Sequence, residues 1–144
     1  MSADVKFMTM ALSLGVAQNG KTGDNPAVGC VLVKNGKVIG SGATANGGRP
    51  HAEIIAFEKA GSARGATAYV TLEPCSHTGR SGPCVDALID AKIARCVIAA
   101  IDPNPLVNWQ GAARLQEAGI DTSIGLMEME ARASMAQFFA RFIK

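Results

Sequence analysis

Two short segments of the sequence carry the residue types of a metal site, and their separation constrains the fold. The first is His51–Glu53, with the sequence His-Ala-Glu, and the second is Pro74–Cys84, in which eight residues lie between Cys75 and Cys84. An extended chain would hold those two thiols up to about 30 Å apart, so both can bind one ion only if the segment loops back. Two glycines and a second proline within the segment favour such a loop. The fold must therefore bring both cysteines together and next to His51.

The residue types at these positions predict a catalytic zinc site. Two thiolates and one imidazole are ligands that zinc accepts, and three protein ligands leave the fourth tetrahedral position open for water. We therefore predict zinc at His51, Cys75 and Cys84. Side chains two residues apart on a helix diverge by about 200°, so Glu53 is expected to flank the ion without binding it. A closed structural site with His77 as the fourth ligand is the alternative, and it would leave Glu53 without a role.

Composition and charge favour one globular domain, residues 1–144. Hydrophobic residues make up 48% of the chain and charged residues 18%, which is typical of a protein with a large core. The net charge is +2 and the Lys and Arg residues are scattered, so the sequence lacks the basic footprint of a general nucleic-acid binder. The N-terminus has no signal-peptide pattern, and no apolar run approaches the ~20 residues that span a bilayer. We expect a cytoplasmic protein without membrane association, whose other cysteines, Cys30 and Cys96, are buried small hydrophobes.

Hydrophobic periodicity predicts an α/β protein. Helices are expected at 4–18, 51–60, 85–91, 111–118 and 128–142, and strands at 28–33, 38–43, 67–72, 95–101 and 120–124. Asn35-Gly36 between the first two strands is typical of a type I′ hairpin turn. The apolar run 95–101 is typical of a buried parallel strand. This order predicts a three-layer α/β/α sandwich around one five-stranded mixed sheet.

The two metal-site segments resemble a known signature. His51–Glu53 followed by Pro74–Cys84 resembles the zinc-dependent cytidine-deaminase superfamily, whose pattern is HxE followed by PCxxC. The longer spacing between the cysteines is similar to the deaminase domain of the bifunctional deaminase-reductase of riboflavin biosynthesis. Segments 25–33, 47–53 and 101–107 also resemble this domain, and the similarity runs from about residue 5 to the C-terminus. The resemblance implies the cytidine-deaminase-like fold.

The resemblance also implies a reaction and a set of substrate contacts. The amino group of a phosphoribosylated diaminopyrimidine (diaminohydroxyphosphoribosylaminopyrimidine) would be hydrolysed to a carbonyl with release of ammonia. Glu53 would take a proton from water, deliver it to the ring nitrogen and then assist the leaving ammonia. A basic residue meets the ribose phosphate in this family, and Arg80 stands at its position. The implied substrate-binding residues are Asn25, His77, Arg80, Asp102 and Asn104.

Three departures from the family keep other functions open. Thr44 stands where members often carry a substrate-contacting His, and residues 108–110 (Asn-Trp-Gln) replace a small Gly-containing run. We expect Trp109 to pack against the last helix rather than to stack on a base. The sequence stops at Lys144, before the reductase domain that normally follows in this family, so a free-standing deaminase, an excised domain and a paralogue acting on another amino-substituted base are all open. A separate reductase is an expected partner, and a homo-oligomer of at least two copies is expected. The alternatives are a deaminase of guanine, cytosine or a related base or nucleoside, hence an amino-pyrimidine or purine substrate, and a non-catalytic zinc-stabilised binding protein.

Overall fold

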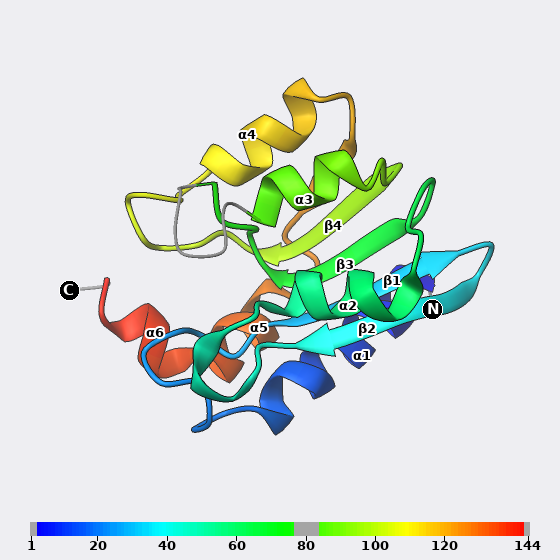
Figure 1. The fold of residues 1–144 in the computed structure, drawn as a ribbon. Coiled ribbons are helices and arrows are strands. Elements are labelled where there is room, and N and C mark those ends of the chain that lie inside the picture. Colours follow the sequence, from blue (N-terminus) through cyan, green and yellow to red (C-terminus); the bar gives the residue numbers. More distant parts are fainter. Residues whose placement is uncertain (1–2, 77–83, 143–144) are drawn as a thin grey trace.

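The computed structural model describes residues 3–76 and 84–142, and these form one five-stranded sheet covered by helices on both faces (Figure 1). The strands are β1 (Gly29–Lys34), β2 (Lys37–Ala43), β3 (Thr67–Leu72), β4 (Arg95–Ala100) and β5 (Asp121–Ile124). The helices are α1 (Ala3–Ala17), α2 (Ala52–Ala60), α3 (Cys84–Asp90), α4 (Gln110–Glu117), α5 (Glu128–Ser134) and α6 (Ala136–Ala140), and a short 3-10 turn lies at Asn46–Gly48.

The sheet is mixed, in the strand order β2-β1-β3-β4-β5. β1 runs antiparallel to both β2 and β3, whereas β3, β4 and β5 are parallel to one another. α1 and α5 pack on one face, and α2, α3 and α4 lie on the other (Figure 1). The predicted three-layer sandwich and its mixed sheet are therefore confirmed.

Local chemistry explains the sheet. Asn35 and Gly36 both have positive φ, 53° and 75°, as the two central positions of a type I′ turn require. Every residue of β4 after Arg95 is buried, which fits a central parallel strand covered by helices on both faces. The hairpin turn and the buried strand are thus the elements that the sequence predicted most directly.

Two helix boundaries differ from the prediction. His51 lies just before α2 in extended conformation, rather than inside its first turn. The predicted helix 128–142 is two helices, because the backbone breaks at Met135, where φ is −118° and ψ is 34°. The Ser134 hydroxyl donates to the Ala131 carbonyl at 2.7 Å, a local bond that competes with the helical ladder. Apolar periodicity carries no sign of such a bond.

Small residues on β2 let α2 approach the sheet closely. A Cβ atom at Gly40 would meet the carbonyl oxygen of Ala56, and one at Gly42 would lie 2.8 Å from the carbonyl oxygen of Ala52. Both carbonyls belong to α2, and α2 follows directly after His51. The two glycines therefore set the height of α2 above the sheet and, with it, the position of His51.

Replacing Gly40 by Ala should lower the free energy of unfolding by about 1–3 kcal/mol, because the added methyl group forces α2 away from β2. Urea denaturation followed by circular dichroism measures the change. Ser41→Ala is the control, since this neighbouring side chain points to the opposite face of the strand. Equal unfolding midpoints for the two variants would contradict the close-approach explanation.

The start of α1 is fixed to the sheet by one carboxylate. Asp4 accepts two bonds from the Arg95 guanidinium, at 2.9 and 2.8 Å, and a third from the Tyr69 hydroxyl at 2.6 Å. The bonds from Arg95 and Tyr69 hold the pKa of Asp4 below its ordinary value. Because Arg95 begins β4 and Tyr69 lies in β3, this carboxylate joins three elements.

Asp4→Asn should lower the free energy of unfolding at pH 7 by about 1–2 kcal/mol, since a charged acceptor is lost from a partly exposed site. A pKa that is lower in the folded chain gives stability above the unfolded pKa of about 3.9, and this stability disappears as pH falls through the folded value. The difference between wild type and variant should therefore shrink below about pH 4. Urea unfolding at a series of pH values tests this, and a difference that stays constant into acid would contradict it.

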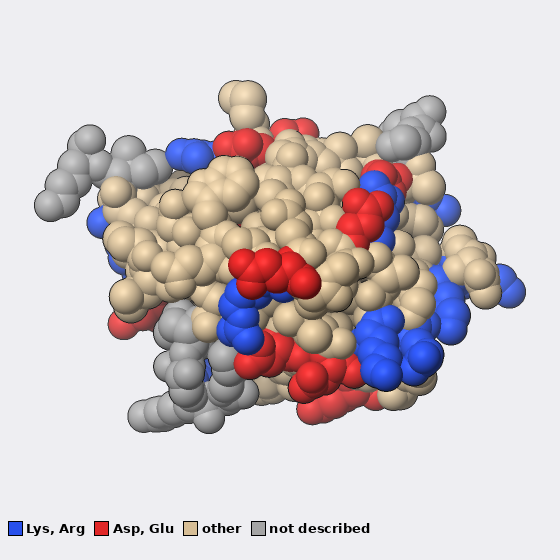
Figure 2. Space-filling model, turned by 90° about the horizontal axis from the view of Figure 1, so that it is seen from above, with Lys and Arg blue, Asp and Glu red and all other residues tan. Residues whose placement is uncertain are grey.

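Charges are mixed on the surface. Figure 2 shows one face on which acidic and basic side chains lie next to one another, and other residues form most of that face. No continuous field of one sign covers this face. None of the helices in 3–76 and 84–142 has the length and apolar character to span a membrane.

Candidate active site

His51, Cys75 and Cys84 meet at one point. Their ligand atoms all lie within 4.8 Å of one another. His51 Nδ1 is 3.0 Å from Cys84 Sγ, and the backbone N–H of Cys84 donates to Cys75 Sγ at 3.3 Å. His51 precedes α2, Cys75 follows β3, and Cys84 begins α3, so three separate elements deliver the group. The thiols of Cys75 and Cys84 therefore lie close together, as two thiols on one ion require.

The charges of these three residues are coupled. Hydrogen bonds from Cys84 and His51 lower the pKa of Cys75 to about 4, and the bond to Cys75 raises the pKa of Cys84. The Cys75 contact also raises the pKa of His51. One thiolate is thus stabilised by two neighbouring donors. One nitrogen and two sulfur atoms at this spacing form a donor set that fits zinc, which binds deprotonated thiols and neutral imidazole.

Glu53 lies in the first turn of α2, two residues after His51, and only 4% of it is exposed. Burial raises the pKa of its carboxyl to about 7. A carboxyl in that range exchanges protons readily at neutral pH. The structure therefore places a buried carboxyl near the His-Cys-Cys group.

Glu53, His51 and Cys75 line one cavity of about 170 Å³. Three of the predicted substrate-binding residues, Asn25, Asp102 and Asn104, also line it. The remaining lining residues are Pro26, Val28, Thr44, Arg49, Leu72, Glu73, Val107 and Phe138. His77 and Arg80, the other two predicted contacts, lie outside the described residues.

The polar walls of the cavity are held by hydrogen bonds to loop backbone. Asn25 Nδ2 donates to the Gly48 carbonyl at 3.0 Å. Asp102 Oδ1 accepts the backbone N–H of Asn104 at 2.8 Å, and Asn104 Oδ1 accepts the backbone N–H of Leu106 at 3.0 Å. These bonds fix the orientation of the side chains, so the wall is formed before a ligand arrives.

Thr44, which departs from the family pattern, has a structural task. It is 2% exposed, its hydroxyl donates to the Pro26 carbonyl at 3.1 Å, and it accepts the backbone N–H of Val28 at 3.0 Å. Both partners belong to the loop that carries Asn25. The hydroxyl thus stabilises a wall of the cavity, and its hydrogen bonds are directed to the backbone.

Glu73 is the main functional residue that the sequence analysis missed. Its carboxylate is buried and accepts backbone N–H groups of Asp102 at 3.2 Å, Trp109 at 3.0 Å and Ala112 at 2.9 Å. Burial raises the pKa of Glu73, and the bonds from Ala112, Trp109 and Asp102 oppose that rise. The signal in the sequence was a charged residue directly after the apolar strand Thr67–Leu72.

Arg49 and Trp109 are not among the predicted site residues. Arg49 was not predicted as a site residue, yet its exposed guanidinium lines the cavity, and its charge lowers the pKa of His51 against the larger raising effect of Cys75. Trp109 does not line the cavity: it is 55% exposed and lines a surface hollow together with Arg132 and Phe139. Its φ is 65°, a conformation that glycine adopts without strain, which explains why a Gly-containing run can occupy this place in related chains.

Glu73→Gln should lower the free energy of unfolding by about 2–3 kcal/mol, because the amide offers one acceptor where backbone N–H groups approach both oxygens. Urea denaturation measures this change. Glu117→Gln, an exposed carboxylate on α4, removes the same charge and should have little effect. A midpoint for Glu73→Gln equal to that of Glu117→Gln would show that the buried bonds are not stabilising.

The fold and the His-Cys-Cys group with its adjacent glutamate are those of a zinc-binding deaminase. Residues 1–100 match the model of the cytidine and deoxycytidylate deaminase zinc-binding region, and the chain belongs to this family. The family resemblance predicted from the two motif segments is therefore confirmed.

Within the family, the chain is similar to proteins of riboflavin biosynthesis. It is 54% identical over 135 residues to the riboflavin biosynthesis protein RibD of Escherichia coli (strain K12), covering 92% of this chain and 37% of that protein. It is 44% identical to the diaminohydroxyphosphoribosylamino-pyrimidine deaminase of Buchnera aphidicola subsp. Schizaphis graminum, covering 94% of this chain and 92% of that protein. The structure of Acinetobacter baumannii RibD superposes with a TM-score of 0.91 and 44% identity, covering 97% of this chain and 40% of that one. The chain thus spans about two fifths of the length of the RibD proteins it matches.

Proposed function

We propose that residues 1–144 form a single zinc-dependent hydrolytic deaminase domain acting on diaminohydroxyphosphoribosylaminopyrimidine in riboflavin biosynthesis. The observation that carries the proposal is the group of His51, Cys75 and Cys84 in one cavity with the buried carboxyl of Glu53. The relative from Buchnera aphidicola, which the chain covers over 92% of its length, bears the name of this activity. The reaction consumes one water, converts the ring C–NH₂ to a carbonyl and releases one ammonia.

His51, Cys75 and Cys84 would hold the zinc ion. A zinc ion bound there supplies Lewis-acid activation of water at neutral pH. Glu53 then acts as the proton carrier: its carboxylate takes the proton that the attacking water loses and delivers it to the ring nitrogen. A second transfer through the same carboxyl protonates the departing amino group. Its burial keeps competing water away from the carboxyl during both transfers.

The remaining walls would orient the ring. Asn25, Asp102 and Asn104 present polar groups that hydrogen bonds to loop backbone hold in place, which reduces the entropy lost on binding. His77 and Arg80 remain predicted contacts from the family resemblance, with Arg80 toward the ribose phosphate. A homo-oligomer, a separate reductase partner and a cytoplasmic location also remain predictions.

One observation favours a second candidate, a deaminase of guanine, cytosine or a related base or nucleoside. Thr44 stands where related chains often carry a substrate-contacting His, and its hydroxyl is bonded to the backbone of Pro26 and Val28. A change of residue in the cavity wall can change which substrate the cavity accepts. A panel containing the phosphoribosylated diaminopyrimidine, free bases and nucleosides decides between the candidates, and turnover confined to compounds without phosphate would overturn the first.

Glu53→Gln should retain one zinc ion per chain while ammonia release falls about 10²–10⁴-fold, since the amide cannot carry protons. Metal analysis of the purified protein and an ammonia assay measure the two quantities. Glu58→Gln is the matched control, because Glu58 is an exposed carboxylate on the same helix. Undiminished turnover in Glu53→Gln would contradict the assigned role, and zinc-loaded wild type that deaminates nothing on the panel would favour the non-catalytic alternative.

A further inference from the structure

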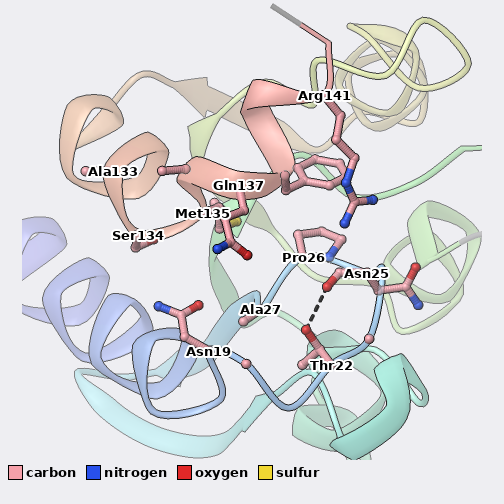
Figure 3. A pocket seen from close by; sticks show the side chains of 14 residues that line it. Asn19, Thr22, Asn25, Pro26, Ala27, Ala133, Ser134, Met135, Gln137 and Arg141 are labelled. Atoms are coloured by element: carbon pink, nitrogen blue, oxygen red, sulfur yellow. Dashed lines mark hydrogen bonds between the residues drawn. The ribbon is translucent and has the colours of Figure 1, made fainter.

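A second hollow adjoins the candidate active site. It has a volume of about 640 Å³ and lies between the loop 19–27, which follows α1, and the helices α5 and α6 (Figure 3). We call it the outer hollow and the 170 Å³ cavity the inner cavity. Asn25, Pro26 and Phe138 line both of them. These three residues therefore stand at the junction, and a molecule bound in the inner cavity can extend into the outer hollow.

The outer hollow is lined by polar side chains from opposite sides. Figure 3 shows Asn19 and Thr22 on the loop side, facing Gln137 and Arg141 of the C-terminal segment. The amides suit a hydroxylated ligand, because each can donate and accept hydrogen bonds. The Thr22 hydroxyl donates to the Asn25 carbonyl at 2.6 Å, and apolar side chains form part of the lining. Within the described part of the chain, the amide of Gln137 has no hydrogen-bond partner. The lining thus combines amide groups with apolar surface, and a sugar presents both hydroxyls and C–H groups to such a lining.

Arg141 places a positive charge at this hollow. One nitrogen, Nη1, donates to the backbone carbonyl of Asp24 at 2.7 Å, and the guanidinium lies 5.8 Å from the centre of the Phe138 ring. The Asp24 carboxylate is 4.0 Å from Nη2 and fully exposed, so it competes weakly for the charge. A guanidinium has five N–H donors and binds phosphate oxygens in a bidentate manner. Arg141 is therefore held in position while it keeps donors for an anion.

The volumes of the inner cavity and the outer hollow indicate that each holds a different part of a ligand. Sites that enclose a whole small ligand have volumes of about 300–1,000 Å³. The inner cavity, at about 170 Å³, lies below that range, whereas the outer hollow, at about 640 Å³, lies within it. A heterocycle with a sugar phosphate attached would need both spaces.

We propose that the outer hollow binds the sugar-phosphate tail of the substrate and that Arg141 binds its phosphate. The inference rests on the proposed function, because it assumes a phosphorylated substrate whose ring is in the inner cavity. Asn25, at the junction, lies where the ring joins the sugar.

Kinetics of Arg141→Gln test the proposal. We expect KM for the phosphorylated substrate to rise about 10–100-fold with kcat within about threefold, because the tail contact is the same in ground and transition states. On the dephosphorylated substrate, wild type and variant should have equal KM. Arg64→Gln is the control, since it removes the same charge from an exposed site on the loop between α2 and β3, away from both cavities. A wild-type KM for the phosphorylated substrate in Arg141→Gln would overturn the inference and leave the proposed function intact.

A second variant and a direct binding measurement test the proposal even if Arg141→Gln does not fold. Gln137→Leu removes a side chain without hydrogen-bond partners in residues 3–76 and 84–142, so it should fold normally and raise KM about 3–10-fold, as the loss of about one hydrogen bond implies. Calorimetric titration with ribose 5-phosphate should show binding to wild type and to Glu53→Gln, and loss of binding in Arg141→Gln. If wild type releases no ammonia, the proposed function is wrong, and this titration alone decides whether Arg141 binds a sugar phosphate. Equal binding by wild type and Arg141→Gln would exclude the assignment.

Discussion

The buried carboxylate of Glu73 is the interaction on which the site depends most. It sits one residue beyond β3 and two residues before Cys75, and it receives backbone N–H groups from Asp102, Trp109 and Ala112. One side chain thereby fixes the end of a strand, a cavity-lining loop and the beginning of α4 with respect to one another. A buried charge is tolerated there because backbone donors replace the water that it loses. The metal-ligand group and the wall opposite it are therefore parts of one rigid frame.

The sequence allowed the fold and the metal-ligand group to be predicted because both have local signatures. Asn35-Gly36 favours a single turn type, the run after Arg95 suits one kind of strand, and His and Cys are the residue types that zinc selects. The break at Met135 and the clustering of backbone donors around Glu73 could not be predicted, since each depends on contacts between segments distant in sequence or on one side-chain bond. The cavity walls likewise depend on contacts between segments that are distant in the sequence. Their residues come from four separate loops and from α2, β3 and α6, and only the fold brings them together.

The inner cavity and the outer hollow have different linings, and these linings suit different roles. The inner cavity has the His-Cys-Cys group that could hold a metal ion and the buried carboxyl of Glu53, which suit chemistry on a ring. The outer hollow has amides and a guanidinium, which suit recognition without chemistry. Asn25, Pro26 and Phe138 belong to both, so a change in the loop after α1 alters the two together. Related chains could then change substrate by altering α5 and α6 while keeping the metal-binding residues.

Trp109 has a further consequence, because it is the single tryptophan of the chain. Its backbone N–H is bound by Glu73, and its ring is 55% exposed beside α5 and α6. Its fluorescence emission should consequently report the position of the loop that carries Asp102 and Asn104, free of contributions from any other indole. The molecule contains its own optical probe on the loop that follows Asp102 and Asn104, and ligand binding to that loop can be followed without a label.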